Sequence, residues 1–153
     1  MSELSDLYQQ VILDHNRNPQ NFHKLQGTHQ MAEGYNPLCG DKITLYLKTN
    51  GEIIQEVGFE GSGCAISKAS GSLMTLSIKG KTKSQVQALS KKFQEMVTSD
   101  WSSPPPSDMG KLAVFSGVRE FPMRVKCATL AWHTLLAALE GKNEIVSTEK
   151  QKG

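Results

Sequence analysis

The sequence lacks three features that would each assign it to a class at once: a long apolar run, an excess of charge and paired cysteines. Of its 153 residues, 38% are hydrophobic and the mean hydropathy is −0.37. No apolar run approaches the ~20 residues that a membrane-spanning helix needs. The 17 basic and 15 acidic residues leave a net charge of +2, too small a field to attract a polyanion. We therefore expect a soluble protein with no nucleic acid and no membrane as partner.

Cysteine is scarce, with three residues and no Cys-x-x-Cys pair. The start from Met1 to Asp6 is acidic and leads into an amphipathic pattern, whereas a secretory signal begins with basic residues and an apolar core. This predicts a cytoplasmic protein with reduced thiols. An odd number of reduced thiols indicates metal binding, catalysis or simple burial instead of a disulfide framework.

The length fits one domain, spanning 1–153, with a core of its own. Two segments of alternating apolar and polar residues flank Asn50-Gly51, a pattern that predicts a β-hairpin. We expect a short strand before it. Strands followed by helices predict an α+β fold, with a small three-stranded antiparallel sheet and helices packed on one face. The expected strands cover 31–35, 42–48 and 52–60, and the expected helices cover 3–16, 64–74, 84–98, 109–117 and 127–140.

Two segments fall outside this pattern. The stretch 99–108 holds three consecutive prolines, which neither a helix nor a central strand accepts, so we interpret it as an inserted Pro-rich loop. The tail 142–153 is polar, and we expect it to be frayed.

The segment from Asn36 to Asp41 carries a thiol, Cys39, and a carboxylate, Asp41, two residues apart. Side chains at i and i+2 of an extended segment point to the same side, so both can address one point. Gly40 between them leaves room for a ligand or for an unusual backbone angle.

The other two thiols, Cys64 and Cys127, each lie at an expected helix start. Free N–H groups and the helix dipole at such a position lower a thiol pKa from ~8.5 toward neutrality. Three thiolates and one carboxylate are a suitable tetrahedral ligand set for Zn²⁺. We therefore predict that Cys39, Asp41, Cys64 and Cys127 bind zinc.

Two cations flank the third thiol. Zinc with three thiolates and a carboxylate has a formal charge of −2, which surroundings of low dielectric constant penalise. Arg124 and Lys126 can offset that charge, and the planar guanidinium of Arg124 is the better suited to bridge carboxylate and sulfur acceptors.

The four histidines are the alternative ligands. At ~100° per residue, His133 lies roughly 120° around the last helix from Cys127, which argues against it. His15 lies at the end of the first helix, and His23 and His29 lie in expected loops, so we regard each as a weaker candidate.

Three motifs together resemble the IscU/NifU N-terminal family of iron–sulfur cluster assembly proteins, and the resemblance extends from Leu7 to Leu139. They are Asn36-Pro37-Leu38-Cys39-Gly40-Asp41, then Phe59-Glu60-Gly61-Ser62-Gly63-Cys64-Ala65-Ile66-Ser67-Lys68-Ala69-Ser70, and finally Arg124-Val125-Lys126-Cys127-Ala128-Thr129-Leu130-Ala131-Trp132.

Within the family the chain resembles the SufU branch. Scaffold-type members carry a histidine directly before the third cysteine, where this chain has Lys126. The resemblance implies bound zinc, a SufS-type cysteine desulfurase as partner, downstream cluster-assembly proteins, and Cys39 as the thiol that leaves the metal to receive persulfide sulfur. One alternative is a scaffold on which an iron–sulfur cluster is built and transferred. Another is a non-catalytic adaptor in which zinc only stabilises the fold.

Overall fold

The structure is a computed structural model that describes residues 3–27, 30–100, 104, 108–119, 121–141 and 145–147. One helix comes first along the chain, three strands follow it, and the other helices and a short last strand come after them. The elements are α1 (Glu3–Arg17), β1 (Gln30–Asn36), β2 (Asp41–Asn50), β3 (Ile53–Ser62), α2 (Ala65–Ile78), α3 (Lys83–Thr98), the 3-10 helix η1 (Gly110–Val118), α4 (Pro122–Leu139) and β4 (Ile145–Ser147).

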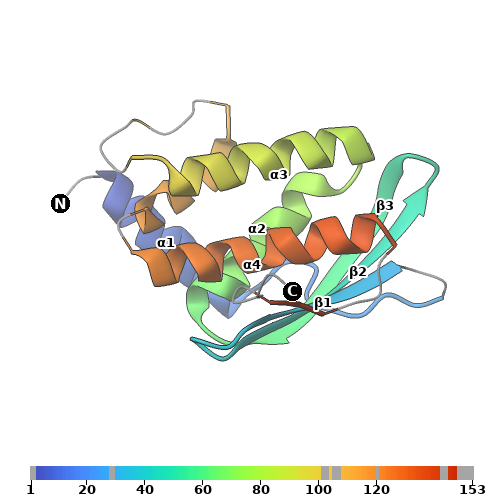
Figure 1. Cartoon of the computed structure of the whole chain (residues 1–153). Coiled ribbons are helices and arrows are strands. Elements are labelled where there is room, and N and C mark those ends of the chain that lie inside the picture. Colours follow the sequence, from blue (N-terminus) through green and yellow to red (C-terminus); the bar gives the residue numbers. More distant parts are fainter. Residues whose placement is uncertain are drawn as a thin grey trace.

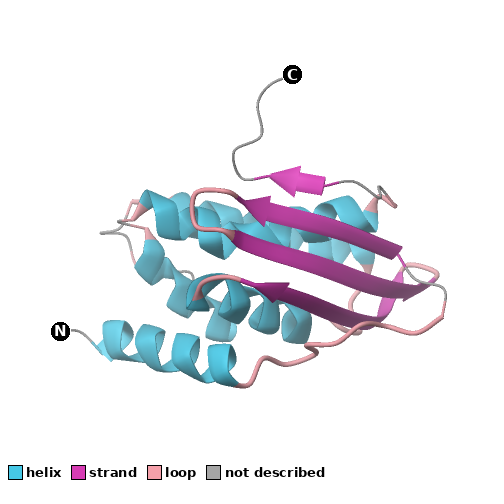
Figure 2. Ribbon diagram, turned by 90° about the horizontal axis from the view of Figure 1, so that it is seen from below, coloured by secondary structure: helices cyan, strands magenta, loops and turns pink. Residues whose placement is uncertain are grey.

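One sheet carries the helices on a single face (Figure 1). Its strand order is β3-β2-β1-β4, with β1, β2 and β3 antiparallel and β4 parallel to β1. Seen from below, the three long strands lie in front of the helices (Figure 2). The predicted antiparallel sheet of three strands with helices on one face is therefore confirmed.

The sheet core follows the two-residue period of the strands. Alternate residues of β2, such as Ile43, Leu45 and Leu47, are buried under the helices. The same alternation turns Asn36, the last residue of β1, and Asp41, the first residue of β2, to the helix side, and both have no exposed surface. The inner face of the sheet is thus apolar along β2 and polar at its end, where Asn36 and Asp41 lie.

Helix α4 lies close against β1. A Cβ atom added to Gly34 would collide with Oγ1 of Thr134 and stand 3.0 Å from Cδ1 of Leu130. Leu130 and Thr134 are buried and share a helical face with Cys127, as the helical period predicts. The absent side chain at Gly34 therefore allows the approach that brings Cys127 to the end of the sheet.

The start of α4 differs from the prediction. We expected the helix to begin at Cys127, but it begins at Pro122, with Phe121 as N-cap. Proline suits the first helical position, since its fixed φ angle fits a helix and it has no N–H to leave unpaired. Cys127 consequently lies inside the helix, beyond its first turn.

The hairpin between β2 and β3 is where Asn50-Gly51 predicts it, with Asn50 paired to Ile53 and Gly51 at a φ of 66°. The tail prediction needs a correction, because Ile145–Ser147 forms β4 beside Glu33, Gly34 and Tyr35 of β1. The edge of β1 offers backbone hydrogen-bonding groups, which a short extended segment can satisfy whatever its side chains. Residues 142–144 and 148–153 lie outside the described part.

The ends of the Pro-rich segment 99–108 are anchored. Arg119 donates hydrogen bonds from Nη1 to Oγ of Ser99 at 3.1 Å and to the carbonyl oxygen of Asp100 at 3.0 Å, and Asp108 pairs with Lys92. Residues 101–103 and 105–107 lie outside the described residues. Within the described ranges, no helix is long and apolar enough to cross a membrane.

Candidate metal centre

The first two donors belong to the loop that joins β1 to β2. Asn36 and Asp41 are paired in register and close a four-residue loop of which Cys39 is the third member. The backbone N–H of Gly40 donates to the carbonyl oxygen of Asn36 at 2.8 Å, and Gly40 has a φ of 74°. We derived the convergence of Cys39 and Asp41 from an extended segment, but Cys39 lies in a turn. The turn brings the two side chains together because it reverses the chain.

Asp41 is held through both carboxylate oxygens. Its Oδ1 accepts the backbone N–H of Cys64 at 2.8 Å, and its Oδ2 accepts Nδ2 of Asn36 at 3.2 Å. Gly63 allows the first contact, since a Cβ atom there would collide with Oδ1 of Asp41 and stand 2.8 Å from its Cα atom. The carboxylate is therefore fixed before any ligand arrives.

Cys64 is the N-cap of α2. Its sulfur accepts the backbone N–H of Ser67 at 3.4 Å and lies 3.8 Å from Oδ2 of Asp41. A hydrogen bond from the Cys127 thiol, supported by the Ser67 N–H, lowers the pKa of Cys64 to about 7, although burial opposes the shift. The pKa of Cys64 is thus lowered in the predicted direction, but the contact with Cys127 is the larger cause and the N–H group at the helix start only adds to it.

Cys127 behaves in the opposite way. Its pKa is raised, first because its thiol donates to Cys64 and then because it is buried. The prediction that Cys127 is a helix-start thiolate is wrong for the same reason as the predicted start of α4. The N–H groups inside a helix already have carbonyl partners, so none is available to stabilise a thiolate at Cys127.

Three of the four predicted donors converge at the end of the sheet. Ligand atoms of Cys39, Asp41 and Cys127 all lie within 4.8 Å of one another. The Cys39 and Cys127 sulfurs are 3.6 Å apart. Two zinc–sulfur bonds of about 2.3 Å at the tetrahedral angle place two sulfurs about 3.8 Å apart, so the spacing fits zinc. Cys64 falls outside the 4.8 Å group but approaches Asp41, as described above.

The two cations predicted to flank the centre, Arg124 and Lys126, differ in their surroundings. The guanidinium of Arg124 lies over the ring of Phe121, 4.4 Å from its centroid, and Arg124 is exposed, whereas Lys126 is half-buried. Of the histidines, His15 contacts Ser72 through Nδ1 at 2.7 Å. His29 lies outside the described residues.

Sequence reasoning missed Asn36, which we named only as the start of a motif. Its buried amide contacts two of the four donors, because Nδ2 also lies 3.6 Å from Sγ of Cys127. The available signal was its position: a residue directly before a four-residue hairpin loop pairs with the residue directly after it, here Asp41.

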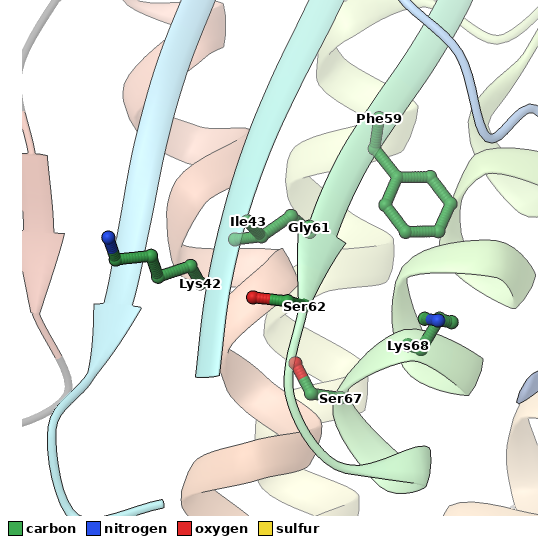
Figure 3. Close-up of a pocket in the computed structure, with 7 residues that line it drawn as sticks. All are labelled: Lys42, Ile43, Phe59, Gly61, Ser62, Ser67 and Lys68. Carbon is green, nitrogen blue, oxygen red and sulfur yellow. The ribbon is translucent and has the colours of Figure 1, made fainter. Parts of the chain in front are cut away.

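A small hollow lies beside the centre, where the ends of β2 and β3 meet α2 (Figure 3). Two lysines line it, Lys42 from β2 and Lys68 from α2, and the side chain of Lys42 extends away from Lys68. The other lining residues are Ile43, Phe59, Gly61, Ser62 and Ser67. The metal donors remain the chemically distinctive group of this region.

Comparisons with known proteins agree with this architecture. The family model of the NifU-like N-terminal domain matches residues 7–139, so the chain belongs to that family. The zinc-dependent sulfurtransferase SufU of Bacillus subtilis is 41% identical, over 93% of this chain and 97% of the relative. The iron–sulfur cluster assembly scaffold protein IscU of Streptococcus pyogenes is 39% identical, over 92% of this chain and 87% of the relative.

A solved structure gives the same result for the fold. A SufU from Fervidobacterium islandicum, assigned as a scaffold protein for the SUF system, superposes with a TM-score of 0.79 at 37% identity. The superposition covers 88% of this chain and 97% of that chain. This chain is thus a member of the IscU/SufU group by sequence and by fold.

Proposed function

We propose that the chain is a zinc-dependent acceptor of persulfide sulfur, which takes sulfur from a SufS-type cysteine desulfurase and passes it into iron–sulfur cluster assembly. One observation carries the proposal: the donors differ sharply in accessibility. Cys39 is exposed, Cys64 is intermediate and Cys127 is buried, while Asp41 has no exposed surface. Cys39 is therefore the most accessible of these three thiols to a sulfur atom carried by another protein.

Cys39, Asp41, Cys64 and Cys127 would hold the zinc. Bound zinc would keep the sulfurs as thiolates near neutral pH, where free cysteine is mostly protonated. Three of these residues are fixed by the fold: Asp41 by two hydrogen bonds, Cys64 as a helix cap and Cys127 within α4. Cys39 instead lies on the loop, which makes it the ligand best placed to leave.

The transfer step needs no outside oxidant. The Cys39 thiolate attacks the terminal sulfur of the desulfurase persulfide, and a new S–S bond forms at Sγ of Cys39. The S–S bond of the donor breaks, and its electron pair leaves with the desulfurase cysteine as a thiolate. A Cβ atom at Gly40 would meet nothing within 4 Å, so there is open space next to Cys39 for the donor to approach.

The assay measures transfer of labelled sulfur from a desulfurase to this protein, together with desulfurase turnover. We expect Cys39→Ala to abolish labelling and stimulation while the variant keeps its fold in circular dichroism. Labelling of Cys39→Ala at the level of the unmodified protein would contradict the proposal. If Cys39→Ser loses only stability, and transfer falls no more than unfolding explains, the adaptor hypothesis replaces ours.

The second candidate is a scaffold that carries an iron–sulfur cluster. The Streptococcus pyogenes relative, named as such a scaffold, and the group of three thiols support it. Anaerobic purification separates the two functions. A colourless protein with one tightly bound zinc favours sulfur transfer, whereas a reconstituted cluster that moves rapidly to an apo-protein favours the scaffold.

A further inference from the structure

The side chain of Asn36 links two ligands of the candidate centre, Asp41 on β2 and Cys127 on α4. Its Nδ2 donates to Oδ2 of Asp41 at 3.2 Å and lies 3.6 Å from Sγ of Cys127. Its Oδ1 accepts the backbone N–H of Leu38 at 3.2 Å, and the residue has no exposed surface. The amide nitrogen thus contacts two ligand atoms. The amide oxygen accepts a hydrogen bond from the loop that carries Cys39.

We propose that Asn36 is the positioning residue that keeps Asp41 and Cys127, two of the three permanent ligands, together while Cys39 leaves and returns. This role rests on the proposed function, because only a ligand exchange at Cys39 requires a permanent part. Asn36 is suited to it because its amide nitrogen contacts Asp41 and Cys127 directly, at 3.2 Å and 3.6 Å.

Charge explains why an amide occupies this position. Zinc with three thiolates and one carboxylate carries a formal charge of −2, and burial makes that charge costly. The N–H groups of Asn36 are directed at a carboxylate oxygen and a sulfur, so they offset part of it without adding a competing ligand charge. An aspartate of the same shape would instead add a second carboxylate beside Asp41.

The first experiment measures zinc affinity by competition with a chromophoric chelator, without any desulfurase. Asn36→Leu keeps the branched shape in a larger side chain but removes both donors and the acceptor. We expect it to weaken zinc binding by about 10–100-fold, the usual cost of losing an outer hydrogen-bond partner. Asn36→Asp, a second variant of the same shape, should lose at least as much. Cobalt(II) in place of zinc should show weaker thiolate absorption bands in both variants.

Ser72→Ala is the matched control. Ser72 is fully buried, and its Oγ lies 2.7 Å from both Nδ1 of His15 and the backbone nitrogen of Gln20. Its loss should lower thermal stability and leave both the zinc affinity and the cobalt spectrum unchanged. If Asn36→Leu and Asn36→Asp bind zinc as tightly as the unmodified protein, the proposal is overturned.

A double-mutant cycle with Cys39→Ala tests the division into a permanent and an exchangeable part. If Asn36 acts through Asp41 and Cys127, the loss caused by Asn36→Leu is the same with and without Cys39, because independent effects add in free energy. If Asn36 acts by holding the loop through Leu38, the loss disappears when Cys39 is absent, and our assignment is wrong. The cycle needs no sulfur transfer, so its result stands even if the sulfur-acceptor function fails.

Discussion

Replacing Gly63 by alanine should damage the fold and the metal centre together. Gly63 has a φ of 140°, and a Cβ atom there would stand 2.8 Å from the Cα atom of Asp41 and collide with its carboxylate. The Cα atom belongs to the backbone, so no side-chain rotation relieves the contact. A backbone conformation that only glycine adopts readily costs about 1–3 kcal/mol in another residue, and the displaced Asp41 adds to that cost.

Gly80→Ala provides the comparison. Gly80 also has a positive φ, of 85°, but a Cβ atom there would meet nothing within 4 Å. Alanine at Gly80 should therefore cost only the left-handed conformation, about 1–2 kcal/mol. For a chain of this size, each kcal/mol lowers Tm by about 2–4 °C.

Urea denaturation of the zinc-free proteins and zinc competition measure the two effects separately. We expect Gly63→Ala to be less stable than Gly80→Ala and to bind zinc more weakly, while Gly80→Ala keeps the affinity of the unmodified protein. Equal stability and equal zinc affinity for the two variants would refute the contact between Gly63 and Asp41 as the structural cause.

Two further perturbations test the helix that carries Cys127. Burial lowers the pKa of His133 below 6.5, so the folded state holds it neutral while the unfolded chain takes up a proton below that pH. Stability should fall as the pH drops through about 6.5 toward the folded-state pKa. In zinc-free protein, the urea midpoints at about pH 7.5 and about pH 5.5 should differ less for His133→Gln than for the unmodified protein. An equal difference in the two proteins would show that another group causes the acid sensitivity. Gly34→Ala should cost about 1–3 kcal/mol by overpacking against Thr134. Adding Thr134→Ala should restore part of that loss, whereas strictly additive losses would show that no steric conflict exists there.

Much of the sheet could be predicted because its signals are local. Alternating residues in β2 and β3 and the Asn50-Gly51 pair specify a hairpin without reference to the rest of the chain. β4 could not be predicted in this way, because a segment of three residues carries too little pattern. Its pairing depends on the free edge of β1, which exists only in the folded sheet.

The centre shows the same division. The residue types of the four predicted ligands point to zinc from the sequence alone. The protonation of the thiols does not follow, because the sequence predicts a helix start at both Cys64 and Cys127 and only Cys64 caps a helix. Because α4 begins at Pro122 and not at Cys127, Cys127 lies inside the helix and has no free N–H groups near its thiol.

The sequence by itself determined the hairpin, the apolar faces of the helices and the kind of metal that the donors suit, because these depend on neighbouring residues and on side-chain chemistry. Tertiary structure decided that Cys127 comes within 3.6 Å of Cys39 across 88 positions of the chain. It also decided that Cys39 is exposed while Cys127 is buried. Accessibility depends on which elements pack over a side chain, and here α4 can pack at the end of the sheet because Gly34 has no side chain.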